Sequence, residues 1–152
     1  MSRQATAPGA SAAIGAALYG LATRAARRLP RDMSLTSAAT LATLDRTGPR
    51  RITDLAAVEG VTQPAMTALV RVLEESGLVE RRGDASDKRV TLVCLTEAGA
   101  AYVRARRQAG VHAFERLIDE LSGAEVKTLV AALPALKHLA ELESRHREGP
   151  KP

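Results

Sequence analysis

Hydrophobic residues in the first part of the chain recur at steps of three and four, the spacing that places them on one face of an α-helix. The series runs Ile14, Leu18, Leu21, Ala25 and Leu29, and it stops before Pro30. This pattern predicts a helix from about residue 11 to residue 29. The other face of that helix carries several arginines. They could form a solvated surface, or they could contact phosphate groups.

The next hydrophobic pattern predicts a shorter helix with Thr36 as its N-cap and with Leu41 and Leu44 facing inward. Gly48-Pro49 would end this helix, because neither residue favours its continuation. Residues 50–52 are then suited to one short strand.

Two short helices joined by a glycine turn are predicted to follow. Thr53 is a candidate N-cap for a helix over residues 54–59, and Gly60 can take the left-handed conformation that ends it. Thr62 is a candidate N-cap for the next helix. Two helices in this arrangement are typical of a helix-turn-helix unit.

The helix predicted over residues 63–76 has two contrasting faces. Four hydrophobic residues form its inward stripe: Met66, Leu69, Val70 and Leu73. Gln63, Thr67 and Arg71 follow one another at steps of four on the other side, and Pro64 occupies the first turn, where its missing N–H is harmless. An exposed row of amide, hydroxyl and guanidinium groups is suited to base edges and phosphates in a major groove, although a solvated polar face would look the same in isolation.

Two β-rich runs, residues 78–82 and 90–95, flank the polar segment from Gly83 to Arg89. They predict a hairpin, and a hairpin directly after a helix-turn-helix is a wing. Since the tip holds acidic as well as basic residues, we expect Asp84 or Asp87 to brace Arg89. Lys88, or Arg81 with Arg82, would then be left to contact a DNA backbone.

Two long helices complete the predicted fold. Thr96 would cap the first, and Ser122 with Glu125 forms a capping-box pattern at the start of the second, which Pro134 should kink or break. Residues 1–12 and 146–152 are predicted to be tails around a single domain over residues 13–145. The expected fold class is mainly α with a small β-hairpin wing.

Composition limits the function classes. A chain of 152 residues with 45% hydrophobic and 26% charged residues is of ordinary globular type. The net charge of +5 arises from the first 31 residues, whereas residues 61–95 are neutral in sum, so the charge alone does not establish DNA binding. We expect a cytoplasmic protein, since no apolar run approaches the length of a membrane-spanning helix and a single cysteine cannot form an internal disulfide.

Candidate chemistry is sparse. Cys94 falls in a predicted strand, which favours a structural cysteine over a redox sensor. The three histidines, His112, His138 and His146, lack the close spacing of metal ligands. No nucleophile motif, phosphate-binding glycine loop or carboxylate cluster is present, so we predict neither an enzyme nor a metal or cofactor site.

Several motifs in this order and spacing resemble the MarR-type winged-helix transcription regulators. The resemblance is close over about residues 50–100, whereas the flanking helices match in order and length. The residues that carry it are Ile52-Thr53-Asp54-Leu55-Ala56, Val61-Thr62-Gln63-Pro64-Ala65-Met66-Thr67, Leu69-Val70, Leu73-Glu74, Gly77-Leu78-Val79-Glu80-Arg81, Asp87-Lys88-Arg89 and Leu95-Thr96-Glu97-Ala98-Gly99.

The resemblance implies a homodimer that binds double-stranded DNA. A winged helix over about residues 34–95 would read each half of a pseudo-palindromic operator, and helices over about residues 13–30 and 96–145 would form a shared dimerisation platform. Such regulators are most often repressors. Small phenolic or aromatic acids commonly act as their effectors, oxidants act through a cysteine and metals act occasionally, and the usual effector pocket lies between the platform and the DNA-binding lobe.

Carried onto this chain, the resemblance assigns DNA contacts to residues of the recognition helix and the wing. These are Thr62, Gln63, Pro64, Thr67, Arg71, Ser86, Lys88 and Arg89. The family often has arginine where Ser86 stands, and this departure argues against strong minor-groove readout by the wing. A winged-helix module that binds a partner protein through the same polar helix face is the alternative function.

Overall fold

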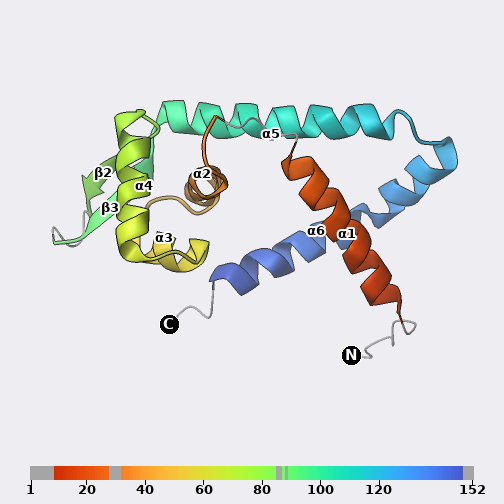
Figure 1. Cartoon of the computed structure of the whole chain (residues 1–152), viewed down its shortest axis with the longest axis horizontal. Helices are drawn as coiled ribbons and strands as arrows, with labels where there is room; N and C mark the ends of the chain where they lie inside the picture. The colour runs from red at the N-terminus through yellow and green to blue at the C-terminus, as the bar shows by residue number, and fades with distance from the viewer. Residues whose placement is uncertain (1–8, 28–31, 85–86, 88, 149–152) are drawn as a thin grey trace.

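The computed structural model describes residues 9–27, 32–84, 87 and 89–148, and it is mainly helical with a small sheet (Figure 1). Helix α5 runs along one side of the molecule, with the sheet and helices α2 to α4 at its first end and helices α1 and α6 toward the other. The elements are α1 (Ala10–Ala26), α2 (Leu35–Thr47), β1 (Arg50–Arg51), α3 (Ile52–Glu59), α4 (Gln63–Glu75), β2 (Val79–Gly83), β3 (Thr91–Leu95), α5 (Glu97–Ile118) and α6 (Gly123–Glu148).

The starts of α2 and α3 differ from the prediction. Ser34, not Thr36, is the N-cap of α2, since its hydroxyl accepts the backbone N–H of Ser37 at 3.0 Å. Helix α3 begins two residues before the predicted start, and its N-cap is Arg51, which makes no side-chain capping bond. Thr53 therefore lies inside the first turn of α3, and the short strand β1 leads into this helix without a polar cap.

Three other predicted helix ends are confirmed. Gly60 ends α3 with a φ of 65° in the left-handed region, and the Thr62 hydroxyl accepts the backbone N–H of Ala65 at 3.4 Å to start α4. Ser122 and Glu125 exchange hydrogen bonds between side chain and backbone at the start of α6, as a capping box does.

The sheet has three antiparallel strands in the order β1-β3-β2. Val79 pairs with Leu95 at the base of the β2–β3 hairpin, and Gly83 pairs with Thr91 toward its tip. β1 adds to the other edge of β3, with Arg50 opposite Val93. The predicted wing is thus confirmed. β1, which lies between α2 and α3 in the chain, attaches the wing to these helices.

The hydrophobic core lies within the winged-helix half. Its buried members come from α2, α3, α4, β2 and β3: Leu41, Leu44, Leu55, Ala56, Met66, Val70, Leu73, Val79 and Val93. The predicted inward stripe of α4 is confirmed, with Met66, Val70 and Leu73 buried and Leu69 partly buried. Tyr102 and Val103 of α5 pack against this core, so the first half of α5 is attached to the winged helix.

The junction between α5 and the winged helix is closely packed. The Thr96 hydroxyl donates to the carbonyl of Gly77 at 2.7 Å and accepts the backbone N–H of Gly99 at 3.0 Å, which confirms Thr96 as the N-cap of α5. The backbone N–H of Thr96 also donates to the carbonyl of Leu78 at 3.1 Å. A Cβ atom at Gly99 would lie 2.1 Å from that carbonyl oxygen, so glycine alone fits at this position.

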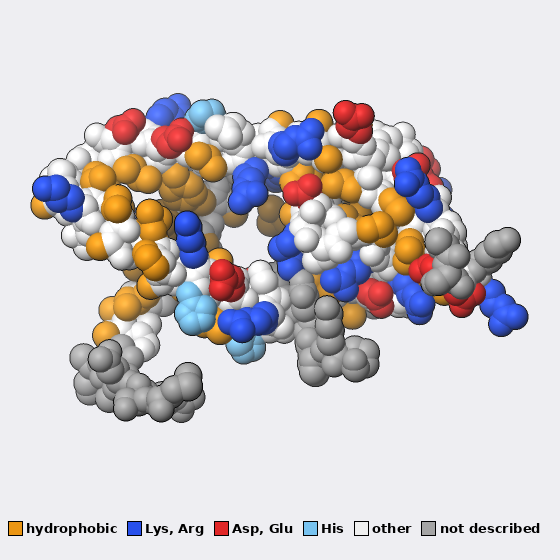
Figure 2. All heavy atoms as spheres, turned by 180° about the vertical axis from the view of Figure 1, so that it is seen from behind, with side chains coloured by type: hydrophobic (Ala, Val, Ile, Leu, Met, Phe, Trp, Pro, Cys, Tyr) orange, Lys and Arg blue, Asp and Glu red, His pale blue; other side chains and the backbone are white. Residues whose placement is uncertain are grey.

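The helices outside the winged helix leave much apolar surface exposed. Hydrophobic side chains gather on the half of the molecule that contains α1, α6 and the end of α5 (Figure 2). Its large exposed members are Ile14, Tyr19, Leu21, Val111, Leu117, Ile118, Leu121, Leu129, Val130, Leu133, Leu136, Leu139 and Leu142. Helix α1 contains no buried residue in the structure of this single chain.

The long helices also differ from the prediction in their bounds. Helix α1 begins at Ala10 and α6 continues to Glu148, so each includes residues expected to belong to a tail. Helix α6 passes through Pro134 without a break. In the part of the chain that is described, no helix combines the length and the hydropathy needed to cross a membrane.

Candidate nucleic-acid interface

The outer face of α4 presents a polar row to solvent. Gln63, Thr67 and Arg71 are all exposed, as their spacing predicts, because Met66, Val70 and Leu73 hold the opposite face in the core. The Thr67 hydroxyl donates to the carbonyl of Gln63 at 2.9 Å, which leaves its oxygen free to accept a further hydrogen bond.

The Arg71 side chain is held only weakly in its present orientation. Its Nε atom lies 3.9 Å from Oε1 of Glu75, one turn further along α4, and both side chains are about two-thirds exposed, at 70% and 64%. An exposed pair at this distance contributes little, about 0.3–0.5 kcal/mol. The guanidinium can therefore leave Glu75 for a base or phosphate at small cost.

A shallow concavity of about 540 Å³ joins this helix face to the wing. Its lining residues are Gln63, Pro64, Thr67, Ala68, Arg71 and Arg81. Arg81 comes from β2, and its Nε atom lies 3.6 Å from Oε2 of Glu74 on α4. The hairpin thus adds a second cation to the same surface, a contribution that the helical spacing of α4 alone does not reveal.

The wing turn is organised by aspartate side chains that bind the backbone. Asp84 accepts the backbone N–H of Asp87 at 3.3 Å, and Asp87 accepts the backbone N–H of Arg89 at 2.9 Å. The prediction that Asp84 or Asp87 braces Arg89 is thus confirmed for Asp87, which holds the backbone of Arg89. Of the predicted wing contacts, Ser86 and Lys88 lie outside the described residues, and Arg89 is exposed.

A second concave surface lies between α2 and α5, on the side of the winged helix that faces the long helices. This groove has a volume of about 710 Å³. The wall from α2 holds Leu35 and three alanines together with the charged Asp45 and Arg46. The wall from α5 holds Tyr102 and Val103 with the cationic Arg106 and Arg107.

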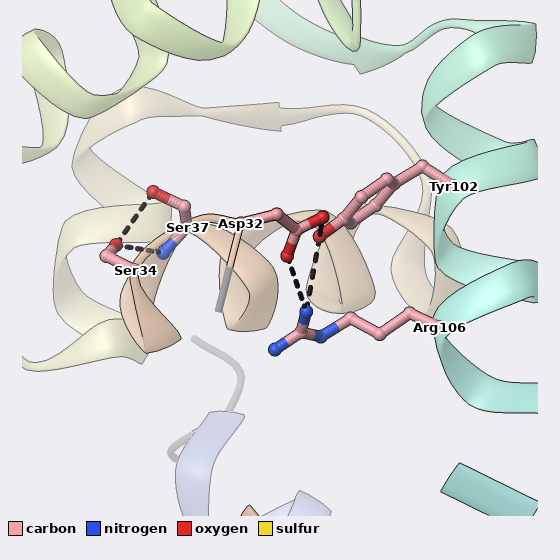
Figure 3. A network of polar contacts seen from close by, with 5 residues as sticks. All are labelled: Asp32, Ser34, Ser37, Tyr102 and Arg106. Atoms are coloured by element: carbon pink, nitrogen blue, oxygen red, sulfur yellow. Dashed lines mark hydrogen bonds and ion pairs between the residues drawn. The ribbon is translucent and has the colours of Figure 1, made fainter. Parts of the chain in front are cut away.

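A polar network lies at the end of this groove (Figure 3). The Tyr102 hydroxyl donates to Oδ2 of Asp32 at 2.9 Å, and Nη1 of Arg106 lies 3.2 Å from both Oδ1 of Asp32 and the Tyr102 oxygen. Asp32 stands just before α2, so the network joins that segment to α5. Hydrophobic periodicity and local motifs do not reveal this network, because Tyr102 and Arg106 lie 70 and 74 positions from Asp32 in the chain.

The network shifts two pKa values in opposite directions. The hydrogen bond from Tyr102, with the nearby Arg106 guanidinium, holds the pKa of Asp32 below its ordinary value, and burial with the Asp32 hydrogen bond raises the pKa of Tyr102. A lowered carboxyl pKa means that the ionised form favours folding at neutral pH. This contribution is lost as the pH falls through the folded-state pKa of Asp32.

We therefore predict that Asp32→Asn lowers the melting temperature at pH 7 and that this difference from the original chain shrinks near pH 3. Thermal unfolding followed by circular dichroism at both pH values checks the expectation. Asp119→Asn, which changes an exposed aspartate at the end of α5, is the control. A deficit of equal size at both pH values would show that ionisation of Asp32 does not matter to the network.

Comparison with known proteins indicates which family part of the chain is similar to. Residues 33–91 match the sequence model of the MarR family. The uncharacterized HTH-type transcriptional regulator YfiV of Bacillus subtilis (strain 168) is 29% identical over 110 residues, which cover 72% of this chain and 69% of YfiV.

Solved structures share the fold. The transcriptional regulator Tm0710 of Thermotoga maritima superposes with a TM-score of 0.74 at 21% identity, over 86% of this chain and 95% of its own. A mutant of Staphylococcus aureus MepR, bound to an oligodeoxyribonucleotide, has a TM-score of 0.63 at 26% identity, over 87% of this chain and 96% of its own. The expected fold class, a winged helix with additional long helices, is confirmed.

Proposed function

We propose that this chain, whose residues 33–91 match the MarR-family model, is a transcriptional regulator that acts as a homodimeric repressor of a pseudo-palindromic operator. The observation that carries the proposal is the exposed row of Gln63, Thr67 and Arg71 beside Arg81 in one concavity. In this proposal residues 34–95 form the DNA-binding lobe, and residues 13–30 and 96–145 form the platform of a cytoplasmic dimer.

Each part of the surface has its own role. Arg71 and Gln63 offer the paired donors, or donor with acceptor, that recognise guanine and adenine in the major groove. Arg81, Lys88 and Arg89 contact phosphates, and their release of counterions supplies the salt-dependent part of the affinity. Thr62 caps α4 through the N–H of Ala65, and Pro64 has no N–H, so the backbone N–H of Gln63 is the first-turn donor that would face the backbone of the DNA.

The exposed apolar surface of α1, α5 and α6 supports the homodimer. Thirteen large hydrophobic side chains there are 36% to 73% exposed in the single chain, far more than scattered surface residues would explain. A second copy of the chain would cover the same residues by two-fold symmetry. The dimer would set the two α4 helices about 34 Å apart, one turn of B-form DNA.

We predict that Leu133→Glu, at a leucine of α6 that is 46% exposed in the single chain, dissociates the dimer. An unpaired carboxylate buried between the subunits should cost about 2 kcal/mol or more for each copy. Sedimentation equilibrium at micromolar concentration checks the mass. Gln108→Glu adds the same charge at a polar, exposed position of α5 and should leave the mass unchanged; a monomeric original chain would refute the dimer itself.

The groove between α2 and α5 is where we place an effector. Its alanine wall and Tyr102 suit a flat aromatic or phenolic body, and Arg106 and Arg107 suit an acidic substituent. An effector releases the operator only if it binds better to the dimer geometry that does not fit the DNA. Failure of small aromatic acids to change operator affinity would remove this part of the proposal.

Footprinting on the DNA beside the gene, followed by gel shifts at two salt concentrations, tests the proposed function. We expect a protected pseudo-palindrome and an affinity that falls steeply with salt, with a log–log slope of about −0.9 for each phosphate contacted. Absence of any salt-dependent DNA affinity would favour the alternative, in which the outer face of α4 binds a partner protein.

A further inference from the structure

Two apolar side chains lie on the exposed face of α4. Pro64 and Ala68 are separated by one helical turn, and both are exposed on the side opposite the buried Met66 and Val70. With Arg71 they line the same concavity as the polar row. A purely solvated helix face would favour charged or amide side chains at these positions.

Neither Pro64 nor Ala68 can exchange a hydrogen bond through its side chain, so each can offer a partner only van der Waals contact and shelter from water. The cations around them, Arg71 from α4 and Arg81 from β2, favour an anionic macromolecule as that partner. The 5-methyl group of thymine is the one apolar group that the base pairs of DNA present in the major groove.

We infer that Pro64 and Ala68 recognise thymine methyl groups, one turn of α4 apart, next to the bases that Gln63 and Arg71 bind. The inference rests on the proposed function and adds a specificity that the polar row does not supply. A cytosine at the same place carries only a hydrogen on C5, where thymine carries its methyl group, so it would lose the contact with Ala68.

The test compares thymine with deoxyuridine, which keeps the base-pairing edge and lacks only the methyl group. A duplex is first selected by the full-length protein from a random-sequence library, and each thymine within its footprint is then replaced singly. We expect at least one thymine in each half-site whose replacement weakens binding about fourfold, the value for burial of one methyl-sized group. Symmetric replacement should weaken it about fifteenfold, since distant sites add.

Protein variants link this effect to Ala68. Ala68→Gly should bring the ratio of uracil to thymine dissociation constants at one symmetric pair of positions to about 1. Ala65→Gly is the matched control, because it makes the same change at an exposed position of α4 that does not line the concavity, and it should keep the original ratio. Each variant is measured on both duplexes, so a general loss of stability cancels. Ala68→Asn, which puts a polar amide where the apolar contact lies and should also bring the ratio to about 1, repeats the measurement should the glycine variant fail to fold.

Two outcomes would overturn the inference and separate it from the proposed function. Sequence-specific binding that is indifferent to every thymine methyl group, or a methyl effect that Ala68→Gly and Ala68→Asn leave intact, would refute readout by this residue and leave the regulator proposal standing. Failure to select any duplex would refute both.

Discussion

Replacement of Arg71 by alanine is expected to weaken operator binding about 5-fold to 150-fold for each half-site while it weakens binding to random DNA much less. The guanidinium is 70% exposed and held only by a 3.9 Å contact with Glu75, so its loss leaves the fold of α4 intact. A bidentate contact with guanine contributes about 1–3 kcal/mol of discrimination, which gives this range. Fluorescence anisotropy with operator and scrambled duplexes provides the two dissociation constants.

A second arginine variant separates base reading from general charge. Arg104→Ala removes the same charge from an exposed position on α5, and it should change both dissociation constants little. Equal losses on operator and scrambled DNA in Arg71→Ala would mean that Arg71 contacts phosphates only, and the base-reading role would pass to Gln63 and Thr67.

Gly99→Ala is expected to destabilise the fold by about 3 kcal/mol, the upper part of the range for an overpacked site. The added Cβ would lie 2.1 Å from the Leu78 carbonyl oxygen and 2.8 Å from Cδ1 of Leu95. The carbonyl cannot move away freely because it also accepts the backbone N–H of Thr96. For a chain of this size the melting temperature should fall by about 6–12 °C, which differential scanning calorimetry measures.

The matched control for this change is Gly123→Ala at the start of α6. A Cβ atom there meets nothing within 4 Å, so this variant should be as stable as the original chain or slightly more stable. If Gly99→Ala melted like Gly123→Ala, the close approach of α5 to Leu78 would not be a feature of the protein in solution.

Local patterns predicted the elements that hold the candidate interface. The contrast between the Met66 stripe and the Gln63 row arises from helical periodicity alone, and the caps at Thr62 and Thr96 arise from side-chain chemistry within four residues. These features depend on neighbours in the chain, and so the sequence contains what is needed to locate them.

Features that depend on residues far apart in the chain were harder to predict from the sequence. The pairing of Arg81 with Glu74 requires the register of β2 against α4, and the Asp32 network joins positions 70 and 74 residues apart. Two predicted N-caps were also wrong. Ser34 rather than Thr36 caps α2, and Arg51 rather than Thr53 is the N-cap of α3.

The hydrogen bonds of Thr96 couple the start of α5 to the end of α4. Because one hydroxyl binds both the carbonyl after α4 and the first turn of α5, these two helices must turn together. A helix of 22 residues is about 33 Å long, so a tilt of about five degrees displaces its far end by about 3 Å. In the proposed dimer, a small shift at the far end of α5, where the long helices meet, would thus change the distance between the two α4 helices.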